Sequence, residues 1–201
     1  KEVAIVFRGE VFVTSVEGGI TKRITNTPEQ ERMVEFGADG KTLYYSTERN
    51  GSWDIYKTSI TRKEEPYFYA STVLKEEPVL ATDKEEFQPD VSPDGKELAY
   101  LEDRNVVRII NLATKAVRTI LPMGNNFSYR DGDQYFKWSP DSKYITIRSS
   151  KGRYGGGEVM LYKADGTDKT GVDISQSGFQ DGGQVFALDG KAIIWSTDKY
   201  G

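Results

Sequence analysis

The stretch VSPDGKELAYL, residues 91–101, decides the fold because the 201-residue chain repeats its opening phrase. Related phrases occur at 36–47 (FGADGKTLYYST), 138–149 (WSPDSKYITIRS) and 186–197 (FALDGKAIIWST). The aspartate of the phrase lies at Asp39, Asp94, Asp141 and Asp189, with separations of 55, 47 and 48 residues. Self-similarity at a period of about 40 to 50 residues predicts a chain built from one repeated supersecondary unit.

Each phrase predicts a β-hairpin. It lies between two runs rich in aromatic and β-branched residues, which is the composition of strands. The aspartate carboxylate can accept a hydrogen bond from a backbone N–H two residues on, Pro93 and Pro140 preset φ, and glycine supplies a positive φ. Ser142 replaces that glycine in the third copy, where we expect a small local strain or a different turn. We interpret the four aspartates as structural turn residues rather than a catalytic set.

Further strands follow each hairpin. A third strand is predicted at 53–60, 106–112 and 158–165, and a fourth at 116–121 and 171–175. Four short antiparallel strands make one blade of a β-propeller. The sequence therefore predicts an all-β fold of four-stranded antiparallel blades, about three full ones between two partial ones, in one incomplete domain over 1–201. The blades are predicted at 1–30 (partial), 31–82, 83–130, 131–178 and 179–201 (partial).

Composition excludes several classes of function. The chain has a formal charge of −4 without long runs of one sign, so no nucleic-acid partner is expected. No apolar run approaches the roughly 20 residues of a membrane-spanning helix, and we expect no membrane insertion. Cysteine and histidine are both absent, which removes thiolate and imidazole metal ligands and a Ser-His-Asp triad. We expect no cofactor, no metal and no catalytic residue in this chain.

The repeated order of strand, Ser-Pro-Asp-Gly-Lys, strand, Asn-Gly and "DIY" resembles the TolB-type or WD-like β-propeller repeat over nearly the whole chain. The phrases RGEVFVTSVEGG (8–19), YYSTERNGSWDIY (44–56) and SQSGFQDGGQVFALDGKAIIWSTDKYG (175–201) more narrowly resemble propeller segments of tricorn-type serine peptidases. Gly37-Ala38 and Ala187-Leu188 depart from the Ser-Pro pattern. The resemblance implies that a nucleophile would lie in a separate carboxy-terminal domain, behind propellers and a PDZ module. It also implies a periplasmic or exported setting, and a cytoplasmic setting is the alternative.

Candidate contact residues come from one insertion and from the inner strands. The first full repeat is longer than the others and carries EEPYFYASTVLKEEP (64–78), in which Tyr67, Phe68 and Tyr69 cannot all point inward. These aromatic residues predict a surface for a peptide or protein partner, and an edge strand with a ragged loop is the alternative. The inner strands are expected to line a channel with polar side chains, namely Arg32, Glu35, Gln88, Asp90, Tyr135, Lys137 and Gln184.

Three functional hypotheses follow. The first is a non-catalytic scaffold, substrate-gating or peptide-binding module of a tricorn-like serine peptidase. The second is a stand-alone TolB-like interaction propeller of the cell envelope, and the third is a carboxylate-based carbohydrate-processing propeller, which needs two acids at a common site. Open blade edges also predict self-association. We interpret RDGDQY (130–135) and GRYGGGE (152–158) as ordinary turns rather than calcium or phosphate sites.

Overall fold

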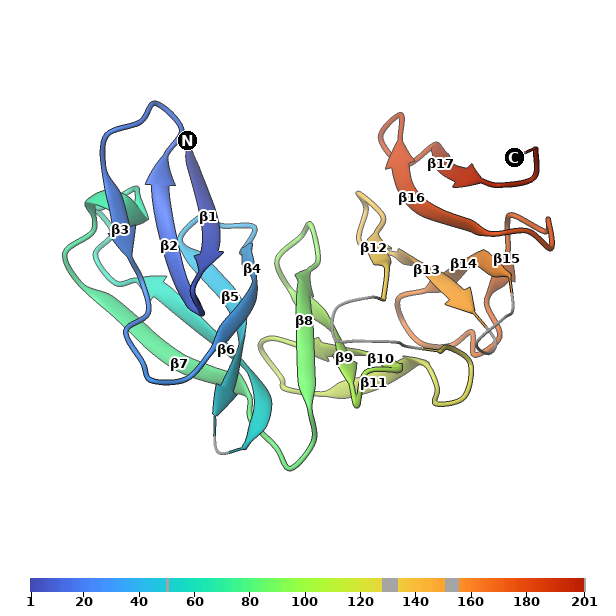
Figure 1. Ribbon diagram of the computed structural model, residues 1–201, viewed down its shortest axis with the longest axis horizontal. Helices are drawn as coiled ribbons and strands as arrows, with labels where there is room; N and C mark the ends of the chain where they lie inside the picture. Colours follow the sequence, from blue (N-terminus) through green and yellow to red (C-terminus); the bar gives the residue numbers. More distant parts are fainter. Residues whose placement is uncertain (50, 128–133, 151–155, 201) are drawn as a thin grey trace. The chain divides into compact units, whose positions relative to one another are not determined.

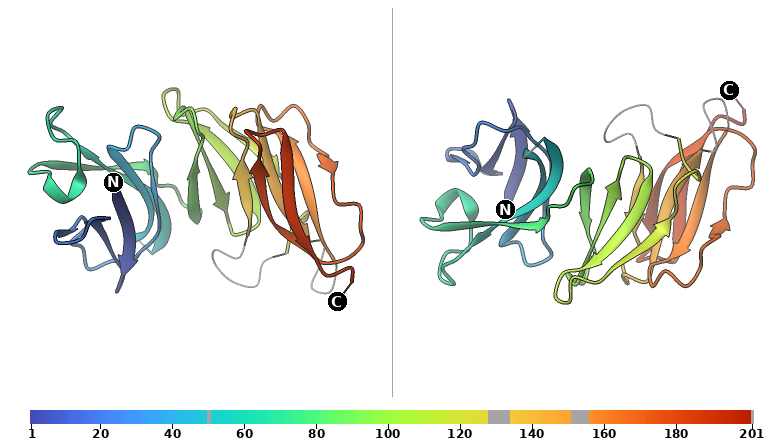
Figure 2. Two further views of the ribbon diagram at one scale, coloured as in Figure 1. Left: turned by 90° about the horizontal axis from the view of Figure 1, so that it is seen from above. Right: turned by 90° about the horizontal axis from the view of Figure 1, so that it is seen from below.

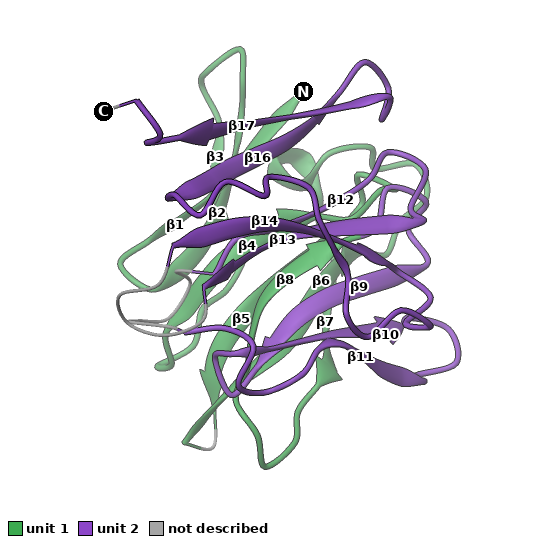
Figure 3. Ribbon diagram, turned by 90° about the vertical axis from the view of Figure 1, so that its right-hand side faces the viewer, with its two compact units in different colours: residues 1–91 green, residues 92–201 purple. Residues whose placement is uncertain are grey.

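The computed structural model describes residues 1–201 except 50, 128–133, 151–155 and 201. The chain divides into two compact units, Lys1–Val91 and Ser92–Gly201 (Figure 3). In the described residues there are seventeen β-strands and one short 3₁₀ helix. Three of the five sheets have four strands, one has three and one has two. The structure thus confirms the predicted all-β fold of four-stranded antiparallel blades.

Unit 1 contains the first two sheets (Figure 1). The three-stranded sheet has the order β1 (Glu2–Phe7), β2 (Glu10–Ser15) and β3 (Thr21–Arg23). The four-stranded sheet has the order β4 (Glu31–Phe36), β5 (Thr42–Arg49), β6 (Ser52–Ile60) and β7 (Leu74–Leu80). The 3₁₀ helix η1 (Phe68–Ala70) lies between β6 and β7, and β8 (Glu86–Val91) ends the unit. The insertion at 64–78 therefore supplies a helical turn and the beginning of an outer strand.

The core of unit 1 lies between its two sheets. Alternate residues of β1 and β2 point toward β5, because neighbouring side chains of a strand face opposite sides. Val11, Val13, Leu43, Tyr45 and Phe68 are completely buried in one cluster. Burying side chains of this size contributes about 1.5 to 3 kcal/mol each. The core thereby fixes η1 against both sheets.

Unit 2 contains β9 (Glu97–Glu102), β10 (Val106–Asn111) and β11 (Val117–Leu121), which pair in that order. Its four-stranded sheet has the order β12 (Phe136–Trp138), β13 (Tyr144–Ser150), β14 (Gly157–Lys163) and β15 (Val172–Asp173). A hairpin of β16 (Asp181–Ala187) and β17 (Ala192–Thr197) follows. This hairpin lies alongside β13 and β14 (Figure 2). Face-to-face stacking of consecutive sheets is the arrangement of propeller blades.

The hairpin turns of the second and third phrases are built alike. Ser92 N–H donates to the Glu97 carbonyl at 2.9 Å, and the Ser92 hydroxyl donates to the Asp94 carboxylate at 2.7 Å. The same two bonds recur at Ser139, with the Tyr144 carbonyl at 2.8 Å and Asp141 at 2.6 Å. Ser142 adopts a φ of +60°, in the region that favours glycine, so the turn is retained at the cost of strain at this residue.

The turn of the fourth phrase differs. Leu188 and Asp189 both have positive φ, +51° and +53°, ahead of Gly190 at +85°. Among the described residues, no hydrogen bond to the Asp189 carboxylate is found, whereas Asp39 accepts bonds from two backbone N–H groups at 2.8 and 3.0 Å. Gly37-Ala38 also lacks the Ser-Pro pair, yet Asp39 caps its turn, so the fourth turn differs through the positive φ of Leu188 and Asp189, and Asp189 does not cap it.

A second repeated device, which the sequence analysis missed, lies at the start of the inner strands. An acid begins β4, β8 and β16, and it accepts a hydrogen bond from a hydroxyl four residues earlier. The pairs are Thr27 with Glu31, Thr82 with Glu86, and Ser177 with Asp181. Two residues after each acid the backbone φ is positive, at Met33, Gln88 and Gly183. In each set the acid follows the Ser or Thr by four positions and precedes the aspartate of the repeated phrase by eight. This spacing was the signal available in the sequence.

Candidate peptide-contact surfaces

Two tyrosines form an exposed aromatic surface on unit 1. The rings of Tyr67 and Tyr69 stack with centroids 5.3 Å apart and planes inclined by 10°. Tyr67 keeps 39% of its surface exposed, and Tyr69 is half-buried. Stacked aromatic pairs at this separation attract each other and restrict each other's motion. The pair offers a flat surface of fixed orientation.

Phe68 does not belong to this surface, and its prediction as a partner contact is wrong. Its side chain is completely buried and meets the ring of Phe36 edge-on, with centroids 6.1 Å apart. The reason is local: with its two tyrosine neighbours on the exposed side, the side chain between them points inward. Phe68 acts as the apolar anchor that holds the two tyrosines in place.

Hydrogen bonds fix the segment around the tyrosines. The Tyr69 N–H donates to the Glu2 carboxylate at 2.9 Å. The Ser71 hydroxyl donates to the Phe68 carbonyl at 2.8 Å, and the Lys22 ammonium donates to the Ser71 carbonyl. These bonds tie η1 to strands β1 and β3, far away in the sequence. A contact surface held in this way loses little conformational entropy on binding.

A groove of about 370 Å³ runs beside Tyr67, and we call it the tyrosine groove. It is lined by Lys1, Glu2, Phe36, Asp39, Gly40, Lys41, Pro66 and Tyr67. The lining combines the aromatic rings and the proline with two lysines and two acids. The turn aspartate Asp39 thus borders the groove, although its Oδ1 atom is occupied by backbone N–H groups.

The inner-strand residues predicted to line a channel differ in exposure. In unit 1, Arg32 is exposed, with its guanidinium carbon 5.4 Å from the Trp53 ring centroid, whereas Asp90 is buried. In unit 2, Lys137 is exposed and Tyr135 is half-buried. Gln184 is completely buried, so its predicted place in an open channel is wrong. A channel lined by the exposed residues stays a prediction.

Unit 1 also holds a buried pair of carboxylates that share one hydroxyl. The Thr25 Oγ1 atom lies 2.7 Å from Glu10 Oε2 and 2.9 Å from Glu31 Oε2, and it accepts the Val11 N–H at 2.9 Å. A hydroxyl has one proton to donate, so it can serve only one ionised carboxylate. The other carboxyl can hydrogen-bond to Thr25 only by carrying a proton of its own and donating it.

The surroundings decide which carboxyl is protonated. Burial raises the pKa of Glu31, only partly opposed by the hydroxyls of Thr27, Thr25 and Thr47, and the Glu10 charge raises it further. Burial also acts to raise the pKa of Glu10, but hydrogen bonds from Arg23 and Thr25 outweigh it and leave that pKa lowered. The Arg49 guanidinium, with its Nη2 atom 3.9 Å from Glu31 Oε1, favours the ionised form of Glu31. With its pKa raised and that of Glu10 lowered, Glu31 is the carboxyl that holds a proton more readily, and Glu10 is the one that ionises first.

A pocket of about 530 Å³ in unit 2 contains the two acids Glu158 and Asp173. The Ser175 hydroxyl lies 2.5 Å from Glu158 and 3.3 Å from Asp173. Glu158 also accepts the Gly178 N–H at 2.9 Å, and Asp173 accepts the Gln176 N–H at 2.9 Å. Both acids thus cap the loop that follows β15, which accounts for their proximity without a substrate.

The described residues supply no group of three or more acidic side chains placed to share a metal ion. In the same part of the chain, no helix has the length and apolarity needed to cross a membrane. Residues 130–133 of the RDGDQY segment and 152–155 of the GRYGGGE segment lie outside the described residues.

Solved structures share this architecture. The chain matches the tricorn protease with a TM-score of 0.70 and 18% identity, over 98% of this chain and 18% of that chain. It matches TolB from Acinetobacter baumannii with a TM-score of 0.59 and 18% identity, over 82% of this chain and 38% of that chain. Oligogalacturonate lyase from Vibrio parahaemolyticus matches with a TM-score of 0.52 and 14% identity, over 76% of this chain and 41% of that chain.

These matches show the β-propeller fold and agree with the TolB-like and tricorn-like resemblance predicted from the sequence. The chain spans less than half the length of each of the three proteins. The fold is shared by proteins named as a protease and a lyase and by TolB. No protein-family model matches the chain, and the comparison with curated proteins finds no match.

Proposed function

We propose that the chain is a non-catalytic β-propeller segment that binds an extended peptide or a protein partner at the tyrosine groove. The observation that carries this proposal is the stacked pair of Tyr67 and Tyr69 beside an open groove, anchored by the buried Phe68. Rigid aromatic side chains in such places dominate the binding energy of protein interfaces. The lysines and acids of the lining would orient a partner's backbone or polar side chains.

The test measures peptide binding by tyrosine variants. A library of random, amidated decapeptides is screened against the purified chain, and the Kd of the tightest binders is measured by fluorescence anisotropy. The Tyr67→Ser/Tyr69→Ser variant is expected to weaken binding at least about tenfold, because an anchor residue contributes more than about 1 kcal/mol. The control is Tyr200→Ser, which removes an exposed tyrosine outside the groove. Unchanged affinity in the double variant would overturn the proposal.

We place this binding role in a tricorn-like serine peptidase, as a scaffold or substrate-gating module. The similarity to the tricorn protease over 98% of this chain supports that assignment. The second candidate is a stand-alone TolB-like interaction propeller of the cell envelope, which the TolB match favours. Both roles suit a periplasmic or exported protein. Reading the coding region beyond these 201 residues for PDZ-like and serine-nucleophile segments distinguishes the two roles.

The non-catalytic part of the proposal has its own test. The purified chain is incubated with fluorogenic peptides and with a fluorophosphonate that labels activated serines. We expect neither cleavage nor labelling. Peptide cleavage with the label bound to a serine of this chain would refute the proposal, whatever the outcome of the binding experiment.

A further inference from the structure

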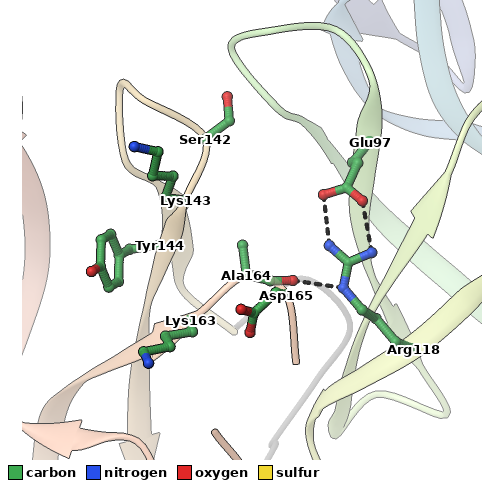
Figure 4. Close-up of a pocket in the computed structure, with 8 residues that line it drawn as sticks. All are labelled: Glu97, Arg118, Ser142, Lys143, Tyr144, Lys163, Ala164 and Asp165. Carbon is green, nitrogen blue, oxygen red and sulfur yellow. Dashed lines mark hydrogen bonds and ion pairs between the residues drawn. The ribbon is translucent and has the colours of Figure 1, made fainter. Parts of the chain in front are cut away.

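A second pocket, of about 520 Å³, lies in unit 2 and is independent of the tyrosine groove. It is lined by Glu97, Arg118, Ser142, Lys143, Tyr144, Lys163, Ala164 and Asp165. Figure 4 shows two facing sides: Glu97 and Arg118 on one, and Lys143, Tyr144 and Lys163 on the other. The turn of the third phrase and the end of β14 build the second side.

The first side is rigid and electrically balanced. Arg118 donates to both oxygens of Glu97, at 2.7 and 2.6 Å, and its Nε donates to the Ala164 carbonyl at 2.6 Å. A bidentate pair of this kind fixes both side chains. Because both Glu97 oxygens are occupied, this carboxylate competes weakly for the lysines across the pocket.

The second side presents positive charge. Among the described residues, the Lys163 ammonium has no hydrogen bond and no ion pair within 4.0 Å, and it acts at longer range on the carboxylates of Asp165 and Asp168. The Lys143 ammonium is exposed and has one carboxylate near it, Asp141, at 4.0 Å. Tyr144 pairs directly with Lys163 across β13 and β14, and its ring lies between the two lysines (Figure 4).

One acid in the pocket partly offsets this charge. Asp165 accepts the Thr167 N–H and hydroxyl at 2.8 and 2.7 Å, which lowers the pKa of its carboxyl and keeps it ionised. The lining residues still contain three cations and two carboxylates, in a chain whose formal charge is −4. An anionic ligand is therefore the complement of this pocket.

We propose that this pocket binds a carboxylate-bearing ligand, with Lys143 and Lys163 contacting the carboxylate and the Tyr144 ring contacting the adjoining carbon atoms. The carboxylate can belong to an acidic peptide side chain or to a free dicarboxylate, since both present the same group. The two ammonium groups attract a carboxylate, so the pocket should bind such a ligand more tightly than a neutral one of the same shape.

The experiment titrates three probes into the ¹⁵N-labelled chain and follows backbone amide shifts. The probes are acetyl-Gly-Glu-Glu-Gly-amide, its Gln-Gln counterpart and free glutarate. We expect saturable shifts at Tyr144 and Ala164 with the Glu-Glu peptide, and none with the Gln-Gln peptide. Shifts with glutarate as well would indicate recognition of the carboxylate alone, whereas shifts with the peptide only would indicate that its backbone also binds.

Charge-matched variants test the two lysines. Lys143→Gln/Lys163→Gln is expected to weaken binding about 2- to 30-fold, the range for losing two exposed ion pairs. Lys96→Gln/Lys191→Gln removes the same charge at turn positions outside the pocket lining, and its Kd should stay unchanged. Equal weakening in both variants, or no saturable shift with either carboxylate probe, overturns the proposal. Equal melting temperatures by circular dichroism verify that both variants are folded.

Discussion

The shared hydroxyl of Thr25 makes a sharp prediction about two neighbouring acids. If Glu31 carries a proton and donates it to Thr25, then glutamine is a close mimic of the native side chain. Its carbonyl oxygen can keep the hydroxyls of Thr27 and Thr47, at 2.8 and 3.0 Å in the native chain, and its amide can donate to Thr25. At pH values below the raised pKa of Glu31, we expect the free energy of unfolding of Glu31→Gln to lie within about 0.5 kcal/mol of the native value.

Glu10→Gln should behave differently, because Glu10 is the anion of the pair. It accepts the Thr25 hydroxyl at 2.7 Å and pairs with the Arg23 guanidinium. A glutamine places an NH₂ group against one of these donors. Hydrogen bonds to a charged group contribute about 1.5 to 3 kcal/mol, and a loss of that size is expected for this variant.

The pH dependence follows from the raised pKa of Glu31. A group whose pKa is higher in the folded state stabilises the fold below its unfolded pKa, near 4.3, and this contribution disappears as the pH rises through the folded value. The native chain should therefore lose stability relative to Glu31→Gln as the pH rises from about 4.3 through the raised pKa of Glu31. The contribution of Glu10 to stability has the opposite pH dependence, because its pKa is lowered in the folded state. That contribution disappears as the pH falls through the lowered pKa.

Urea unfolding followed by tryptophan fluorescence measures these free energies at a series of pH values from about 4 upward. Trp53, in unit 1, is nearly buried and reports on this region. Glu48→Gln removes an exposed carboxylate from the neighbouring strand and serves as the charge control. The reasoning is refuted if Glu31→Gln costs as much as Glu10→Gln, or if its difference from the native chain does not change with pH.

Three further predictions concern the turns and the edge of β1. Asp94→Ala removes hydrogen bonds from Ser92 and Lys96 and should cost about 1 to 2 kcal/mol, whereas Asp189→Ala should cost less than about 0.5 kcal/mol in the same urea titration. Leu188→Gly relieves a positive φ and should raise stability by up to about 1 kcal/mol, and a lower urea midpoint would contradict this. Among the described strands β1 pairs only with β2, and Ile5 is 44% exposed, so we propose that chains associate through this edge. Ile5→Lys should then lower the association seen by light scattering, and a native chain that stays monomeric at high concentration would oppose the proposal.

The hairpins could be predicted because their determinants are local. Ser92, Asp94 and Gly95 lie within four positions of one another, and each has a conformational role that its chemistry dictates. The fourth turn differs because Leu188 and Asp189 both adopt positive φ, which the sequence did not reveal, since Gly37-Ala38 also lacks Ser-Pro and still forms a turn capped by Asp39. Even Ser142 kept the turn, because the strands on both sides specify it more strongly than one unfavourable φ opposes it.

The candidate surfaces depended on contacts that sequence spacing does not reveal. Arg118 meets Glu97 and Ala164, which are 21 and 46 residues away. Tyr69 is held by Glu2, 67 residues earlier. Such pairings follow from strand register and from the stacking of sheets. The exposed tyrosine could be anticipated from the alternation of neighbouring side chains, but the assignment of Phe68 to the inside required the core to be known.

The hydroxyl, acid and aspartate that begin a repeat have an evolutionary consequence. In the first such set, Thr27, Glu31 and Asp39 span 13 residues, and all three act on the hairpin that contains or follows them. A gene duplication that copies one repeat therefore also copies the side chains whose hydrogen bonds stabilise the new hairpin. Lineages can change the number of copies without first altering the neighbouring ones, and selection then acts on the loops.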